Sequence, residues 1–121
     1  MNITFYLAHD KSYHGKLIGS GSISGSYFKE NQFPVMENCV SYKFNNISDL
    51  ENKIINCNSK GGIYSVIIEP FSASTLEAVS NDFMDKLFLL RDKYGFRIIF
   101  DEVFTGFYKS EKMFYFQNFN N

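Results

Sequence analysis

The fold is decided by residues 63–103, which read IYSVIIEPFSASTLEAVSNDFMDKLFLLRDKYGFRIIFDEV. Residues 63–68 and 97–100 are apolar runs of strand length. Between them, Ser74 and Glu77 have the spacing of a helix capping box, and Gly95 supplies the left-handed residue that commonly ends a helix. The apolar positions that would line one face of this helix are Leu76, Val79, Phe83, Leu87, Leu90 and Tyr94. A strand, a helix and a strand in this order predict a right-handed βαβ unit.

The same alternation continues toward the N-terminus. Residues 3–8 (ITFYLA) predict a strand, and residues 39–42 predict a short one. A second capping box, Ser48 with Glu51, predicts a helix that ends at Gly61-Gly62. Its apolar face would hold Leu50, Ile54 and Cys57. Residues 19–26, GSGSISGS, fit either a flexible loop or a tightly packed short helix.

The continuous apolar strands predict the layering of the sheet. Strands that are covered on both faces lack the alternation of apolar and polar residues that half-exposed strands show. We therefore expect an α/β fold, a three-layer segment with a mainly parallel sheet, in a single domain of 121 residues.

Composition excludes several classes of protein. The formal net charge is -1 and 18% of residues are aromatic, which argues against nucleic-acid binding, an anionic membrane surface and acidic disorder. The two cysteines provide neither a disulfide framework nor a zinc pattern. No apolar run approaches the ~20 residues of a membrane span, and the N-terminus lacks the features of a signal peptide. We expect a cytoplasmic protein with no nucleic-acid or membrane partner.

Chemistry is expected where the parallel strands end, because ligands of open α/β sheets bind beyond the carboxyl ends. Three such ends are residues 9–15, Glu69-Pro70 and Asp101-Glu102. Asp101 could cap a following turn or bind a cation; a magnesium role would need the GxxxxGK[ST] phosphate loop, which the sequence lacks. GxGxxG and GxSxG motifs are also absent. His9 and His14 could each be a metal ligand, a base or a structural group.

Several segments together resemble the class III (ornithine/GABA-type) aminotransferases, which are pyridoxal-phosphate (PLP) enzymes of fold type I. The matching segments are Tyr13-His14-Gly15, Lys16 to Gly19, Ile23-Ser24-Gly25, Ile67 to Pro70, Lys93-Tyr94-Gly95, Ile98 to Val103, Thr105-Gly106-Phe107 and Lys112-Met113-Phe114. Their order and spacing match the family across nearly the whole chain. The run from Lys93 is the most specific.

The resemblance implies a cofactor and a role for five side chains. Asp101 matches the carboxylate that keeps the PLP ring nitrogen protonated, which the cofactor needs to act as an electron sink. Tyr13 matches the aromatic residue on one face of the ring, and Val103 matches the residue on the other. His14 belongs to the same motif as Tyr13. Glu69 matches a glutamate on the substrate side. The parent reaction would move an amino group from an amine or ω-amino acid to a 2-oxo acid, in a homodimer.

The sequence also departs from the family pattern. Phe104 stands where a glutamine often contacts the cofactor, Tyr108 and Glu111 stand where glycines are common, and the turn after Glu69-Pro70 lacks the usual glycine.

Two family elements have no match in the chain. The phosphate-binding loop would precede Ile3, and the Schiff-base lysine would follow Phe114, while Lys109 and Lys112 are expected to face solvent. Residues 1–121 are therefore predicted to form a partial PLP-binding large domain with no catalytic residue of its own and negligible transaminase activity alone. The alternative is a non-catalytic remnant or interaction module that keeps the α/β fold.

Overall fold

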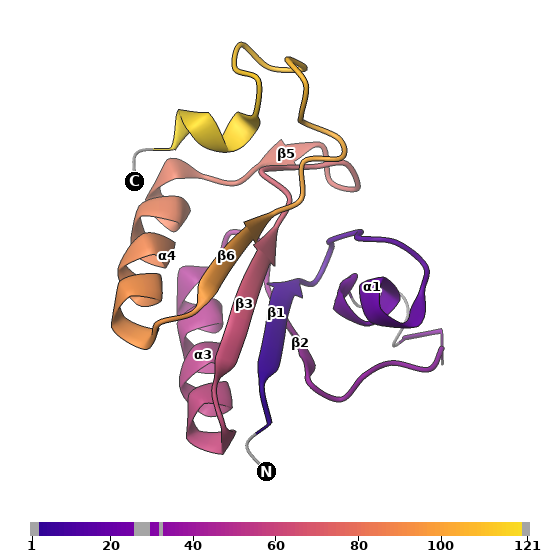
Figure 1. Ribbon diagram of the computed structural model, residues 1–121, viewed down its shortest axis with the longest axis vertical. Helices are drawn as coiled ribbons and strands as arrows, with labels where there is room; N and C mark the ends of the chain where they lie inside the picture. The colour runs from indigo at the N-terminus through magenta and orange to yellow at the C-terminus, as the bar shows by residue number, and fades with distance from the viewer. Residues whose placement is uncertain (1–2, 26–29, 32, 120–121) are drawn as a thin grey trace.

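The architecture is a four-stranded parallel sheet with helices on both faces (Figure 1). The computed structural model describes residues 3–25, 30–31 and 33–119. The order across the sheet is β2-β1-β3-β6. Its strands are β1 (Phe5–His9), β2 (Cys39–Tyr42), β3 (Ile63–Ile68) and β6 (Arg97–Phe100). All neighbouring pairs are parallel, which confirms the predicted α/β fold with a mainly parallel sheet.

Two long helices cover one face of the sheet, α3 (Ile47–Lys60) and α4 (Asn81–Tyr94). Leu7, Val66 and Ile68 from the strands are buried against apolar residues of these helices. The predicted apolar faces are correct in their core members, since Leu50, Ile54 and Cys57 on α3 and Phe83, Leu87 and Leu90 on α4 are all buried. Gly95 ends α4 in the left-handed conformation, as expected.

The opposite face is covered only in part, by the short helix α1 (Ile18–Ile23). Ile23 of α1 packs with Ala8 and Cys39 in a second, smaller apolar cluster. Residues 19–23 thus form a short helix rather than a flexible loop, while Ser26 lies outside the described residues. Ile99 of β6 and Tyr64 of β3 are each 41% exposed on strands that we expected to be covered on both faces. The third layer therefore extends over β1 and β2 and leaves part of β3 and β6 open.

Both predicted capping boxes begin their helices at the wrong residue. The α3 N-cap is Asn46, whose side chain accepts the Asp49 N–H, so the helix begins before Ser48. The α4 N-cap is Ser80, whose side chain accepts the Phe83 N–H. A single polar side chain that accepts a free N–H suffices to cap a helix, so α3 begins two residues before the predicted cap and α4 begins six residues after it.

The segment before α4 is a hairpin instead of a helical turn. Strands β4 (Phe71–Ser72) and β5 (Glu77–Ala78) pair antiparallel, and the Ser74 hydroxyl donates to the Lys11 carbonyl. Leu76, which we placed on the apolar helix face, lies in the hairpin turn at φ 57° and is 69% exposed.

Replacing Leu76 with glycine is expected to raise the free energy of unfolding by about 0.5–1 kcal/mol. A left-handed conformation costs an L-residue roughly 1–2 kcal/mol, and glycine removes this cost. Part of the gain is offset because glycine increases the conformational entropy of the unfolded chain. Leu89→Gly is the matched control, because Leu89 is equally exposed on α4 and glycine inside a helix should lower stability by about 1 kcal/mol. Urea unfolding of the two variants measures both effects. A loss of stability in Leu76→Gly would contradict the expectation.

Candidate functional site

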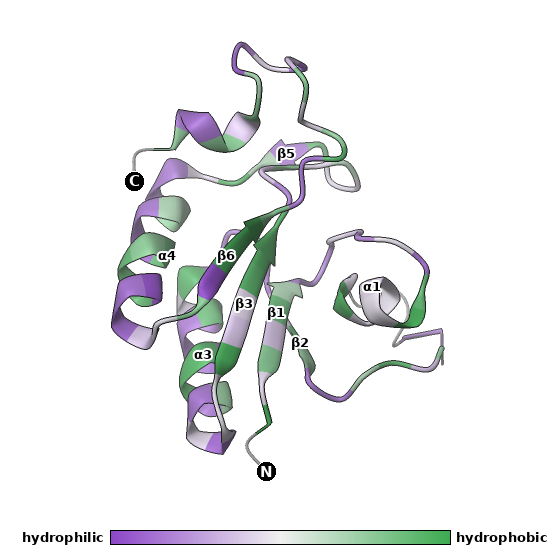
Figure 2. Cartoon of the chain, viewed as in Figure 1, coloured by the Kyte–Doolittle hydropathy of each residue, from purple (hydrophilic) through white to green (hydrophobic). Residues whose placement is uncertain are grey.

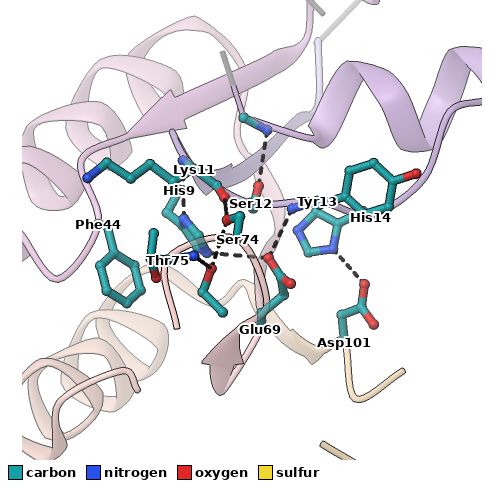
Figure 3. A network of polar contacts seen from close by, with 12 residues as sticks. His9, Lys11, Ser12, Tyr13, His14, Phe44, Glu69, Ser74, Thr75 and Asp101 are labelled. Atoms are coloured by element: carbon teal, nitrogen blue, oxygen red, sulfur yellow. Dashed lines mark hydrogen bonds and ion pairs between the residues drawn. The ribbon is translucent and has the colours of Figure 1, made fainter. Parts of the chain in front are cut away.

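The three predicted strand ends meet at one edge of the sheet (Figure 3). Tyr13 and His14 follow β1, Glu69 follows β3, and Asp101 follows β6. The Tyr13 N–H donates to Glu69 Oε2 over 2.9 Å, and His14 Nδ1 lies 2.7 Å from Asp101 Oδ2. Figure 2 shows hydrophobic residues at the carboxyl ends of β3 and β6, directly before these polar groups. Direct hydrogen bonds between segments distant in sequence thus join Tyr13 to Glu69 and His14 to Asp101.

Asp101 has the turn-capping role that the sequence offered as one of two possibilities. Its Oδ1 accepts the Val103 N–H over 3.1 Å, which caps the turn after β6. Its Oδ2 accepts from the His14 ring, and its own N–H donates to the Ile68 carbonyl. The side chain is one-fifth exposed, so the carboxylate keeps access to solvent on one side. A turn-capping carboxylate can therefore also present a charge to a ligand.

Tyr13 and Val103 project their side chains outward, at 50% and 88% exposure. Both are fixed through their backbones, because the Tyr13 N–H is held by Glu69 and the Val103 N–H by Asp101. Each can therefore offer an apolar surface to a ligand above Asp101 without itself being buried.

The loop that carries Tyr13 and His14 is attached to α1 by two serines that the sequence analysis missed. The Ser24 Oγ accepts the His14 N–H over 2.7 Å. The buried Ser12 Oγ accepts the Gly25 N–H and donates to the Ile23 carbonyl. Ser24 lies in the matching segment Ile23-Ser24-Gly25 and Ser12 directly precedes the Tyr13-His14-Gly15 motif, but neither pattern indicates these hydrogen bonds.

Two glycines allow this loop to lie so close to α1. Gly15 has φ +124°, a conformation that L-residues rarely adopt, and a Cβ there would crowd the Ser20 side chain. A Cβ on Gly25 would overlap the Asp10 carbonyl. The close approach of α1 to the β1 loop therefore requires Gly25.

His9 and Glu69 form a second pair beneath the loop, and both are buried. His9 Nε2 lies 3.7 Å from Glu69 Oε2. Burial, together with the nearby His14 and Lys11 charges, lowers the pKa of His9 to about 4. Burial also raises the pKa of Glu69, against the N–H donors of Tyr13 and Ala73, which favour its charged form. His9, which we predicted to begin the loop, is the last residue of β1 and pairs with Tyr42.

A hollow of about 480 Å³ lies beside His14 and Asp101 on the partly covered face of the sheet. Its walls include Tyr6, Ile23, Ile67 and Ile99. Within residues 3–25, 30–31 and 33–119, no group of three or more His, Cys, Asp and Glu side chains could hold a metal ion. Over the same residues, none of the helices is long and apolar enough to span a membrane. The site is thus a polar cluster bordered by an apolar hollow.

Comparisons with known proteins identify the family. The chain is 30% identical over 112 residues to an acetylornithine aminotransferase of Clostridium acetobutylicum. This alignment covers 91% of the chain and 28% of the length of that protein. It is also 30% identical over 115 residues to a LysW-aminoadipate semialdehyde/glutamate semialdehyde transaminase of Sulfurisphaera tokodaii, spanning 93% of the chain and 28% of that protein. The PLP-bound structure of an amine transaminase from an uncultivated Pseudomonas species covers 91% of the chain, with a TM-score of 0.80 and 25% identity, over 29% of its own length.

The chain is similar to a segment of the aminotransferases. It spans about 28% of the length of the two curated relatives. No family model matches it.

The departures from the aminotransferase pattern have structural counterparts in the loop after Val103. Tyr108 has φ 60°, a conformation that suits the glycine common at this position. Phe104 packs its ring 6.0 Å from the Phe71 ring, with Lys109 Nζ 5.8 Å from its centroid. Lys109 and Lys112 are exposed, as expected. At Phe104 the loop thus has an aromatic contact at the position where the family often has a glutamine.

Proposed function

We propose that this chain supplies the part of a class III, fold-type-I aminotransferase that binds the ring of PLP. The observation that carries the proposal is the hydrogen bond between His14 and Asp101 at the carboxyl end of β6. The Asp101 carboxylate is held by an imidazole, remains partly open to solvent and borders an apolar hollow. It can therefore accept a hydrogen bond from a protonated ring nitrogen.

The residues present fit such a ring. PLP, when bound, withdraws electrons from the substrate carbon that carries the amino group. Asp101 would hold the ring nitrogen in its protonated form, and His14 would orient the Asp101 carboxylate through its Nδ1–H. Tyr13 and Val103 would cover the two faces of the ring. Glu69, which fixes the Tyr13 backbone, would lie on the substrate side.

The activity of the whole protein is proposed from the same relationship. We propose that it transfers an amino group from an amine or ω-amino acid to a 2-oxo acid, in a cytoplasmic homodimer without nucleic-acid or membrane partners. Residues 1–121 would be the partial large domain of that enzyme. No catalytic residue is proposed among them, because Lys109 and Lys112 extend from the loop beyond Asp101 and face solvent.

Pyridoxamine 5′-phosphate is expected to bind the 121-residue chain and to shift the amide resonances of Tyr13, His14 and Val103. This probe has no aldehyde and therefore does not react with surface lysines. Asp101→Asn should weaken binding by roughly 10–100-fold, because it removes a charged hydrogen-bond acceptor. NMR titration of the labelled chain measures both results.

Asp82→Asn is the control for the loss of a carboxylate, because Asp82 is exposed on α4 and pairs only with Lys86 across one helical turn. It should leave the affinity unchanged. Equal affinities for all three proteins would refute the role of Asp101. Absence of any binding would favour the alternative that the chain keeps the fold as a non-catalytic remnant or interaction module.

A further inference from the structure

We propose that His9 is a positioning residue, which keeps the Glu69 carboxylate in place as the acceptor that holds the Tyr13 backbone. The three groups form a chain of contacts at the carboxyl end of β1. His9 Nε2 faces Glu69 Oε2 at 3.7 Å, and the same oxygen accepts the Tyr13 N–H at 2.9 Å (Figure 3). Only the effect of Tyr13 on a cofactor rests on the proposed function; the contacts themselves do not.

The hydrogen bonds of His9 define its tautomer. The Lys11 N–H donates to His9 Nδ1 over 3.3 Å, so Nδ1 carries the lone pair and the ring proton is on Nε2. Among the described residues, Nε2 has no hydrogen-bond partner; it is buried and directed at the Glu69 carboxylate. The imidazole therefore presents an N–H dipole to an oxygen that is otherwise stabilised by backbone donors.

The surroundings of His9 hold the ring in this orientation. Its centroid is 4.8 Å from the Phe44 ring and 6.5 Å from the Tyr42 ring. The titratable and charged groups that act on the His9–Glu69 pair or contact it are Lys11, His14, Asp101 and Tyr42, and Asp10 acts on Tyr42. Lys11 and His14 oppose a positive charge on His9, which favours the neutral donor form over an imidazolium.

Glu69 needs such a donor because it is a buried carboxylate. Desolvation disfavours its charged form, and each N–H directed at it restores part of that cost. Glu69 in turn is the partner of the Tyr13 N–H, one residue before His14 and its bond to Asp101. A change at His9 should therefore reach the candidate cofactor contacts through the backbone of Tyr13.

The test compares His9→Phe with His9→Gln in the full 121-residue chain. Phenylalanine fills the aromatic surroundings without a donor, whereas the glutamine amide places an N–H close to the position of Nε2. We expect His9→Phe to raise the pKa of Glu69, followed by its ¹³C carboxyl resonance, and to speed exchange of the Tyr13 amide roughly tenfold. His9→Gln should restore both readouts toward the wild type. An unchanged Glu69 pKa in His9→Phe would overturn the proposal.

Wild-type measurements keep the proposal falsifiable if the variants do not fold. Long-range ¹H–¹⁵N spectra should show His9 as the Nε2–H tautomer, with a change in its Nε2 resonance as Glu69 titrates. An Nδ1–H tautomer, or a His9 resonance that does not respond to Glu69, would overturn it.

A pyridoxamine 5′-phosphate titration of the same proteins separates the two proposals. Weaker binding by His9→Phe than by His9→Gln is expected, and equal binding by the two would refute transmission to the cofactor site. If the wild type does not bind the probe, the proposed function fails, while the Glu69 pKa and the Tyr13 exchange rate still decide the role of His9.

Discussion

Leu87→Ala is expected to lower the free energy of unfolding by about 3 kcal/mol. Leu87 is fully buried on the face of α4 that packs against the sheet. Removing a buried leucine side chain loses its transfer free energy and leaves a cavity, at a cost of roughly 2–5 kcal/mol in well-packed cores. Because the uncovered face of β3 and β6 adds little apolar burial, the core between the helices and the sheet supports most of the fold.

Leu89→Ala is the matched control, since Leu89 is on the same helix and is 69% exposed. Alanine has the higher helix propensity, so this variant should change stability by less than about 0.5 kcal/mol. Urea denaturation of both variants, with helicity checked by circular dichroism, measures the difference. Similar losses in the two variants would show that α4 is not held by the predicted face.

The elements that could be predicted from the sequence are those with one dominant local signal. The strands 39–42, 63–68 and 97–100 were predicted with the bounds that the structure has, because short apolar runs between polar residues leave few alternatives. The positions of the helix starts could not be predicted in the same way. Ser74 and Ser80 both suit an N-cap, and the choice depends on the Ser74 contact with the Lys11 carbonyl, which is distant in sequence.

The candidate site was predictable where topology alone brings residues together. Parallel strands place their carboxyl ends at one edge, so His14 and Asp101 were expected near each other although they are 87 residues apart. The supporting groups were not predictable, because their roles depend on side-chain directions. Ser24 binds the His14 N–H across a helix, and His9 faces Glu69 only because β1 extends to include it.

Acidification from pH 7 to pH 4 is expected to cost the folded state about 3 kcal/mol through His9. Its pKa falls from 6.5 to about 4 on folding, so the unfolded chain binds the proton more tightly. The contribution of His9 is fully present above pH 6.5 and is lost as the pH falls toward 4. Glu69 acts in the opposite direction, because burial raises its pKa and protonation then favours the folded state.

Comparison with His9→Phe measures the loss of the His9 contribution together with the change that the variant makes at Glu69. The unfolding free energy of His9→Phe should depend less steeply on pH than that of the wild type. The two curves should differ in their total change between pH 7 and pH 4 by at least about 3 kcal/mol, because a higher Glu69 pKa in the variant adds to the difference. Tyr42→Phe is the control, because burial raises the pKa of Tyr42 and removing its hydroxyl should shift stability equally at every pH in this range. Parallel curves for the wild type and His9→Phe would mean that folding leaves the pKa of His9 unchanged, which would contradict the expectation. A greater loss of stability on acidification in His9→Phe than in the wild type would mean that His9 is protonated in the folded state. The imidazole would then be an ion-pair partner of Glu69 rather than the neutral donor that its contact with the Lys11 N–H requires.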